Sequence, residues 1–145
     1  MNIGVKKNKK FDLIVWGATG YTGKLVCEYI FKKYKKTNLN WALAGRNKYK
    51  IDGLISSLKL KGIPHFVADS NNKKSLLKLT KMTNTICSTV GPYAKYGTLL
   101  VEACIESKTN YCDITGETHW IKEIIDKFRI EKKHIKTSGV GFFNK

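Results

Sequence analysis

The segment Phe11–Lys24, with the sequence FDLIVWGATGYTGK, constrains the fold of this chain more than any other stretch. Its first half is a nearly continuous apolar run, which is typical of a strand buried on both faces of a sheet. Gly17, Gly20 and Gly23 follow at intervals of three, and the residues after them are apolar at helical spacing. The segment therefore predicts a strand, a tight glycine turn and a helix, which can hold a phosphate at the helix N-terminus.

Each glycine of this turn has a distinct predicted role. Gly17 makes the turn, Gly20 lets a pyrophosphate come close, and Gly23 lets the helix pack against the strand. A glycine triplet alone is weak evidence, but one that follows a buried strand and opens a helix is a strong indication of dinucleotide binding. In the helix that follows, the spacing predicts an apolar face formed by Leu25, Val26, Tyr29 and Ile30.

The rest of the chain alternates between strand-like and helical patterns. Strands are predicted at 11–16, 40–45, 64–68, 85–90 and 110–114, and a further strand is expected to start within 135–145. Helices are predicted after each of these strands, including one at 75–82, one at 98–107 and one around 121–128, and Lys61-Gly62 is read as the end of the second helix. This alternation predicts a single α/β domain with a doubly wound, mostly parallel sheet.

Ligands of such sheets bind at the carboxyl ends of the strands. The predicted elements bring five segments to that edge, namely 17–23, 45–47, 68–70, 88–93 and 115–117. At the end of the second strand, an NAD site would carry an acidic side chain, but this chain has Arg46 after Gly45 and no carboxylate nearby. A guanidinium can bind a 2′-phosphate, so the sequence favours NADP over NAD. The alternative interpretation of Arg46 is an ordinary surface arginine on a loop.

The strong positive charge of the chain raises the question of nucleic acid. The formal charge of the 145 residues is +16, yet among 27 basic residues only Arg46 and Arg129 are arginine. Arginine makes most bidentate contacts to phosphate and guanine. We therefore interpret the charge as a solvated lysine surface that assists the approach of an anionic cofactor, and no specific nucleic-acid partner is predicted.

The four cysteines form no C-x-x-C pair, and each falls in an apolar helical or strand-like run. We predict that Cys27, Cys87, Cys104 and Cys112 are small buried side chains in a reducing compartment, without a disulfide framework or a metal site. No stretch approaches membrane-spanning length, and the N-terminus has no apolar signal core. We therefore expect an intracellular, cytoplasmic location.

Several motifs together resemble the N-terminal NAD(P)-binding Rossmann domain of saccharopine dehydrogenase-like oxidoreductases. They are GATGYTG (17–23), LAGRN (43–47), STVGPYAKYG (88–97) and VEACIESKTNYCDITGE (101–117). The resemblance divides the chain into a basic extension at 1–10, the NAD(P)-binding domain at 11–134, and a tail at 135–145 where a substrate domain would begin. It implies hydride transfer, an unidentified small-molecule substrate and a homo-oligomer formed through the absent domain.

The resemblance also implies roles for individual residues. The residues expected to wrap the pyrophosphate are Gly17, Thr19, Gly20, Tyr21, Thr22 and Gly23. Arg46 would take the 2′-phosphate, and Ala68 and Asp69 would border the adenine. The nicotinamide half would be lined by Ser88, Thr89, Val90, Gly91 and Pro92. Tyr93, Asp113 and Glu117 would face the substrate, although wall, turn and helix-cap roles explain these three equally well.

Two other classes of function compete with an oxidoreductase. A non-catalytic NADP-sensing or interaction module also fits a G-A-T-G-x-x-G turn, and the absence of a substrate domain from this chain favours it. A binder of nucleic acid or anionic surfaces would use the lysines and would show a steep dependence on salt. The motifs at 91–93 and 113–117, which only a nicotinamide or substrate would need, favour the oxidoreductase.

Overall fold

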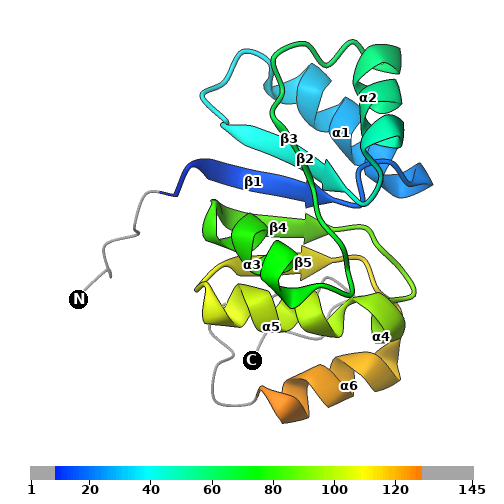
Figure 1. Ribbon diagram of the computed structural model, residues 1–145, viewed down its shortest axis with the longest axis vertical. Helices are drawn as coiled ribbons and strands as arrows, with labels where there is room; N and C mark the ends of the chain where they lie inside the picture. Colours follow the sequence, from blue (N-terminus) through cyan, green and yellow to red (C-terminus); the bar gives the residue numbers. More distant parts are fainter. Residues whose placement is uncertain (1–8, 129–145) are drawn as a thin grey trace.

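β1 (Phe11–Trp16) is the central strand of a five-stranded sheet in a computed structural model that describes residues 9–128. The strand order is β3-β2-β1-β4-β5, and every neighbouring pair is parallel. The strand arrows in Figure 1 accordingly run the same way, and helices lie on both faces of the sheet. The predicted doubly wound α/β fold is confirmed.

The elements alternate along the chain as the sequence predicts. After β1 come α1 (Tyr21–Tyr34), β2 (Trp41–Gly45), α2 (Lys48–Ser57), β3 (His65–Val67), α3 (Lys73–Lys81), β4 (Thr83–Ser88), α4 (Tyr93–Tyr96), α5 (Thr98–Glu106), β5 (Asn110–Asp113) and α6 (Thr118–Lys127). The predicted strand within 135–145 and most of the basic extension lie outside the described residues. Within residues 9–128, no helix is both long and apolar enough to cross a bilayer.

Two hydrophobic cores form because side chains alternate between the faces of β1. Val15 packs with α1 and α2 on one face, in a cluster that includes Leu43 and Cys27. Ile14 and Trp16 point to the other face, which is covered by α3, α5 and α6. Both faces of the central strands are therefore buried, as their continuous apolar runs indicate.

The predicted buried face of α1 is wrong in part. Leu25 and Tyr29 are 51% and 53% exposed, while Gly23, Cys27 and Ile30 face the sheet. A Cβ on Gly23 would overlap the carbonyl oxygen of Gly17, so the helix touches the glycine turn backbone to backbone. That contact fixes the rotation of α1 and places the smaller side chains inward.

The start of β4 and the end of α2 also differ from the sequence prediction, and one short helix was not predicted. β4 begins at Thr83 rather than residue 85, because Thr83 pairs with Phe11 although it is polar. α2 ends at Ser57, ahead of Lys61-Gly62, because Lys59 adopts a φ of 54° and Leu60 donates its N–H to the Ile55 carbonyl at 3.0 Å. These contacts form a Schellman motif with lysine in the position that usually holds glycine. α4 was not predicted.

Two of the four cysteines are placed differently from the prediction. Cys27 and Cys104 are fully buried, as predicted, but Cys87 and Cys112 are only half-buried. None of the four forms a disulfide.

Candidate functional site

A pocket of about 340 Å³ opens at the carboxyl ends of the strands, where the sequence places the ligand. We call it the strand-end pocket. Seven of the predicted site residues line it, namely Gly17, Thr19, Gly20, Arg46, Thr89, Val90 and Gly91. Of its other lining residues, Gly45, Asn47 and Ser70 belong to segments that the sequence placed at this edge without a specific role, and Trp16, Lys50 and Tyr96 were not predicted.

The floor of the strand-end pocket is the glycine turn between β1 and α1. Gly17 has a φ of +85°, and a Cβ there would lie 2.5 Å from Val90 Cγ2 and 2.8 Å from Thr89 Oγ1. The N–H of Gly17 donates to the Ala44 carbonyl at 3.0 Å. The turn therefore has no room for a side chain at Gly17, and its first amide is already used by β2.

The N-terminus of α1 begins beside the same pocket, which Gly20 lines. The N-cap residue is Gly20, which has no side chain to satisfy the first N–H groups of the helix. Its own N–H donates to the Gly17 carbonyl at 3.0 Å. The N–H groups of Tyr21 and Thr22 therefore begin a helix without a side-chain cap, which is the arrangement that binds a phosphate.

Two basic side chains lie on the wall formed by β2 and α2. Arg46 follows the last residue of β2, and Lys50 lies in the first turn of α2. The intervening Asn47 caps α2, and its Oδ1 accepts the Lys50 N–H at 3.0 Å. Among the described residues, neither basic side chain has an ion-pair partner within 4.0 Å. The wall therefore presents two uncompensated positive charges.

Two buried polar atoms at this edge have no hydrogen-bond partner within residues 9–128. They are Trp16 Nε1 and Ser88 Oγ, and their residues are register partners at the ends of β1 and β4. Buried polar groups in native proteins are nearly always satisfied, and Trp16 lines the strand-end pocket. Ser88, a predicted site residue, does not line the pocket. The donors that the pocket offers are backbone N–H groups and two cations, which fit an anionic ligand such as a dinucleotide.

The segment after β3 reaches the pocket through a different residue than predicted. Ala68 is buried in the core, and Asp69 is exposed, with its Oδ1 accepting the Asn71 N–H at 2.9 Å. Ser70, one residue further on, is the one that lines the pocket. Asp69 therefore shapes the turn that presents Ser70.

The loop after β4 is tied to the glycine turn. Thr89 donates its N–H to the Trp16 carbonyl at 2.9 Å, and its Oγ1 lies 3.0 Å from Trp16 O and 3.2 Å from Gly17 O. This fixes the neighbouring Val90 and Gly91 in the pocket wall. Pro92 lies outside the set of lining residues and is the N-cap of α4.

Tyr93 and Glu117 make contacts that position loops. Tyr93 is 7% exposed, its ring packs 5.7 Å from the Trp120 ring, and its hydroxyl donates to the Ser88 carbonyl at 3.2 Å. Burial raises the pKa of Tyr93 to about 12.

The Glu117 carboxylate accepts the N–H groups of Tyr93 and Ala94, and these bonds lower its pKa. Glu117 is thus a cap, as one interpretation of the sequence allowed, but for α4 rather than its own helix.

Asp113 is a buried turn residue. It is 1% exposed and accepts the Tyr111 hydroxyl at 2.7 Å and the Thr115 N–H at 3.1 Å. Burial raises the pKa of its carboxyl group, while the two hydrogen bonds partly oppose this effect. Asp113, Tyr93 and Glu117 all lie outside the lining of the strand-end pocket.

Tyr21, Thr22 and Gly23 also lie outside the pocket lining. The Tyr21 side chain is 84% exposed, and Gly23 is buried against the glycine turn. Among the residues that were missed, Lys50 had a sequence signal, because it is a basic residue only four positions after Arg46. Trp16 carried no such signal, since it reads as the last residue of a buried apolar strand.

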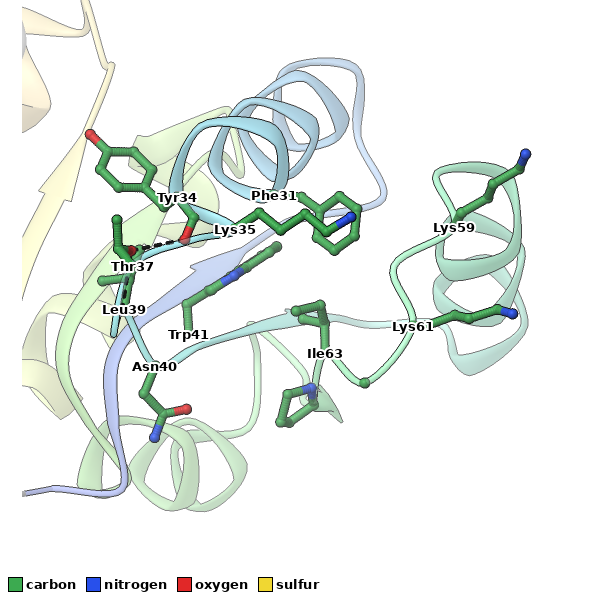
Figure 2. A pocket seen from close by; sticks show the side chains of 12 residues that line it. Phe31, Tyr34, Lys35, Thr37, Leu39, Asn40, Trp41, Lys59, Lys61 and Ile63 are labelled. Atoms are coloured by element: carbon green, nitrogen blue, oxygen red, sulfur yellow. Dashed lines mark hydrogen bonds between the residues drawn. The ribbon is translucent and has the colours of Figure 1, made fainter.

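A second cavity, of about 510 Å³, lies at the opposite edge of the sheet, beside the first residue of β2. Figure 2 shows the Trp41 indole and the Phe31 ring at this cavity, while the amino groups of Lys59 and Lys61 point away from it. The C-termini of α1 and α2 lie here, and their partial negative charge disfavours anions. Lys35 also lines this cavity, with its amino group 5.7 Å from the Phe31 ring centroid. Unlike the strand-end pocket, the cavity is lined by no residue of a helix N-terminus among residues 9–128.

Comparison with known proteins places this geometry in a family. Residues 13–138 match the family described as saccharopine dehydrogenase NADP binding domain. Among solved structures, apo saccharopine dehydrogenase (L-Glu forming) of Saccharomyces cerevisiae aligns with a TM-score of 0.67 and 18% identity over 88% of this chain and 26% of that one. A triphenylmethane reductase of Citrobacter sp. complexed with NADP(H) aligns with a TM-score of 0.66 and 19% identity, over 87% of this chain and 48% of that one. At these identities the structures show the shared fold.

Sequence relatives are closer. A lipid droplet localized protein of Caenorhabditis elegans is 32% identical over 137 residues, which are 90% of this chain and 32% of the relative. A trans-acting enoyl reductase of Mycobacterium tuberculosis is 33% identical over 122 residues, which are 83% of this chain and 29% of the relative. The chain thus spans about a third of the length of these relatives. With the family match and the five-stranded parallel sheet, the resemblance stated from the sequence is confirmed: the chain belongs to the family of saccharopine dehydrogenase NADP-binding domains.

Proposed function

We propose that this chain binds NADP and is the cofactor-binding part of an oxidoreductase that transfers hydride. The observation that carries the proposal is the pair Arg46 and Lys50, which line the strand-end pocket together with Gly20, the N-cap of α1 that has no capping side chain. NAD sites hold the ribose 2′-hydroxyl with a carboxylate, and the lining of this pocket contains none.

The roles of the pocket residues follow from where they stand. The N-terminus of α1 and Gly20 hold the pyrophosphate, and Arg46 with Lys50 holds the 2′-phosphate. Ser70 borders the adenine side, together with the segment at 68–69. Thr89, Val90 and Gly91 line the nicotinamide half. The bound cofactor supplies the hydride, and the protein supplies its orientation.

Calorimetric titration with NADPH and NADH tests this proposal. We expect NADPH to bind more tightly, and Arg46→Ala to weaken NADPH binding by about 10- to 100-fold while changing NADH binding little, since a charge-assisted hydrogen bond contributes about 1.5–3 kcal/mol. Lys48→Ala is the matched control, because Lys48 is exposed beside Arg46 but pairs with Asp52 outside the pocket. Equal or tighter binding of NADH would contradict the proposal.

The substrate of the complete enzyme is a separate part of the proposal. Because mycobacterial relatives carry the name trans-acting enoyl reductase, an enoyl compound is the first acceptor to test. Oxidation of NADPH that depends on this acceptor, followed by absorbance, would support it.

A non-catalytic NADP-binding module is the second candidate. It is favoured by the contacts of Tyr93, Asp113 and Glu117, all three of which bind other parts of the protein and lie outside the pocket lining. In that case the chain binds NADPH, shows no turnover with any acceptor, and keeps its NADPH affinity in the variant Glu117→Gln.

A further inference from the structure

Cys87 and Cys112 stand side by side on neighbouring strands. They are register partners in the parallel pair β4–β5, so their side chains leave the sheet on the same face. Both are half-buried, whereas Cys27 and Cys104 are fully buried. Adjacent parallel strands are about 4.8 Å apart, which lies within the range of about 4.4–6.8 Å between the Cα atoms of bonded cysteines.

The face that carries these two thiols is the less covered face of β4 and β5. Their sequence neighbours Ile86 and Tyr111 point to the opposite face and belong to the core under α3, α5 and α6. In the part of the chain that the structure describes, the core under α1 and α2, on the thiol face, contains residues of β1 and β2 and none of β4 or β5. Ile114, which continues β5, is 58% exposed. Within residues 9–128, the two thiols are therefore open to small reagents.

The two thiols are chemically unequal. The Cys112 thiol donates toward the Ile86 carbonyl at 3.6 Å. The neighbouring Cys112 thiol lowers the pKa of Cys87, and burial, Cys27 and Asp113 oppose this effect. Conversely, the neighbouring Cys87 and burial raise the pKa of Cys112. Burial raises the pKa of Cys27 to about 12. Cys87 is thus the better nucleophile of the pair, because the thiolate is the reactive form.

We propose that Cys87 and Cys112 form a reversible redox pair that a peroxide oxidises to a disulfide. The Cys87 thiolate attacks one oxygen of the peroxide, the O–O bond breaks, and Cys87 becomes a sulfenic acid while hydroxide takes up a proton and leaves as water. Cys112 sulfur then attacks the sulfenic sulfur, the S–S bond forms, and a second water leaves. A dithiol reductant returns both thiols by exchange.

The location of the pair connects it to the strand-end pocket. One residue after Cys87, β4 ends at Ser88 and leads into Thr89, Val90 and Gly91 of the pocket wall. A bond between the two sulfurs restrains the end of β4 against β5 and so shifts this wall. Oxidation therefore weakens NADPH binding, a consequence that rests on the proposed function.

Mass spectrometry separates the four cysteines cleanly, because each lies in a different tryptic peptide: 25–32, 82–95, 96–108 and 109–122. After hydrogen peroxide treatment of the reduced chain, we expect the intact mass to fall by two hydrogen atoms and the peptides 82–95 and 109–122 to be linked. Dithiothreitol should reverse both changes. In Cys112→Ser, Cys87 should accumulate as a sulfenic acid that dimedone traps, and Cys87→Ser should leave Cys112 largely unmodified.

Cys27→Ser and Cys104→Ser are the matched controls, and both should still form the linked peptides. A link that involves Cys27 or Cys104, a disulfide between two chains, or sulfenic acid at Cys112 in preference to Cys87 would overturn the proposal. Titration of the reduced and oxidised chains with NADPH then separates the two proposals. If neither state binds NADPH while the linked peptides form, the proposed function fails and the redox pair stands.

Discussion

The backbone N–H of Tyr93 donates to Oε1 of Glu117 at 2.6 Å, and the neighbouring N–H of Ala94 donates to Oε2 at 3.0 Å. One carboxylate therefore caps the first turn of α4 from the loop that follows β5. This contact joins the two loops that the sequence assigns to the substrate side. It explains why a helix of four residues persists between Pro92 and Gly97.

We predict that Glu117→Ala lowers the free energy of unfolding by about 1–2 kcal/mol, the usual cost of a lost helix cap. The pKa of Glu117 is lower in the folded chain than in the unfolded one. Its contribution is therefore present above the unfolded pKa of about 4.3 and is lost as the pH falls through the folded pKa. Urea unfolding between neutral and acidic pH measures this. Glu123→Ala, an exposed acidic residue of α6, is the control, and the same loss in both variants would contradict the cap.

A second prediction concerns Gly97, at the junction of α4 and α5. A Cβ there would lie 2.6 Å from Trp120 Cζ2 and 2.7 Å from the Tyr93 carbonyl oxygen. Because Trp120 is buried, Gly97→Ala should lower the free energy of unfolding by about 1–3 kcal/mol. Gly53→Ala is the control, since a Cβ in the middle of α2 would meet nothing within 4 Å and should raise stability by about 0.5–1 kcal/mol. Chemical denaturation measures both, and equal effects would contradict the steric argument.

Substitutions of two glycines of the turn should affect cofactor binding and folding separately. A Cβ on Gly20 would meet only the Gly17 carbonyl oxygen, at 3.4 Å, so Gly20→Ala should keep the fold while its methyl group obstructs the pyrophosphate. We expect NADPH binding to weaken about tenfold or more, equivalent to about 1.4 kcal/mol. Gly23→Ala should instead unfold the chain, because its Cβ overlaps the backbone of the turn. Circular dichroism and calorimetry distinguish the two, and an unfolded Gly20→Ala variant would refute this division of roles.

Lys59 offers a stabilising substitution. It closes α2 with a φ of 54°, a conformation that costs a residue with a Cβ about 1–2 kcal/mol. Lys59→Gly should therefore raise the free energy of unfolding by about 0.5–1 kcal/mol after the higher chain entropy of glycine is subtracted. Lys61→Gly, in the same exposed loop, should give no gain. Thermal and urea unfolding measure both, and a gain of equal size at Lys61 would rule out the strain at Lys59 as the cause.

The sequence predicted the strands well because each is a short apolar run bounded by polar or glycine residues. It predicted the lining of the pocket where the backbone conformation of the turn determines which residues line it, as at Gly17 and Gly20. It failed where a contact with a distant part of the chain determines the local structure. The rotation of α1 depends on the approach of Gly23 to Gly17, which apolar spacing does not register, and α4 depends on Glu117, far along the chain.

Side-chain chemistry at the pocket was harder to predict for the same reason. Trp16 was read as a core residue, which is true of its ring, but its Nε1 has no partner among residues 9–128. Cys87 and Cys112 were read as buried because their strands are apolar. They are partly exposed because, on their face of the sheet, α1 and α2 pack on β1 and β2 rather than on β4 and β5. This arrangement depends on the strand order and cannot be seen in the sequence of either strand.

The central position of β1 has a consequence for how the chain folds as it is synthesised. β1 pairs with β2 after one helical crossover, but its other edge pairs with β4, which begins only at Thr83. Until β4 has been translated, the central strand of the sheet has an unpaired apolar edge, which is a template for aggregation. A nascent chain that stalls before Ser88 would expose that edge to other chains. Translation of β4 is therefore needed to cover the edge of β1, which is made much earlier.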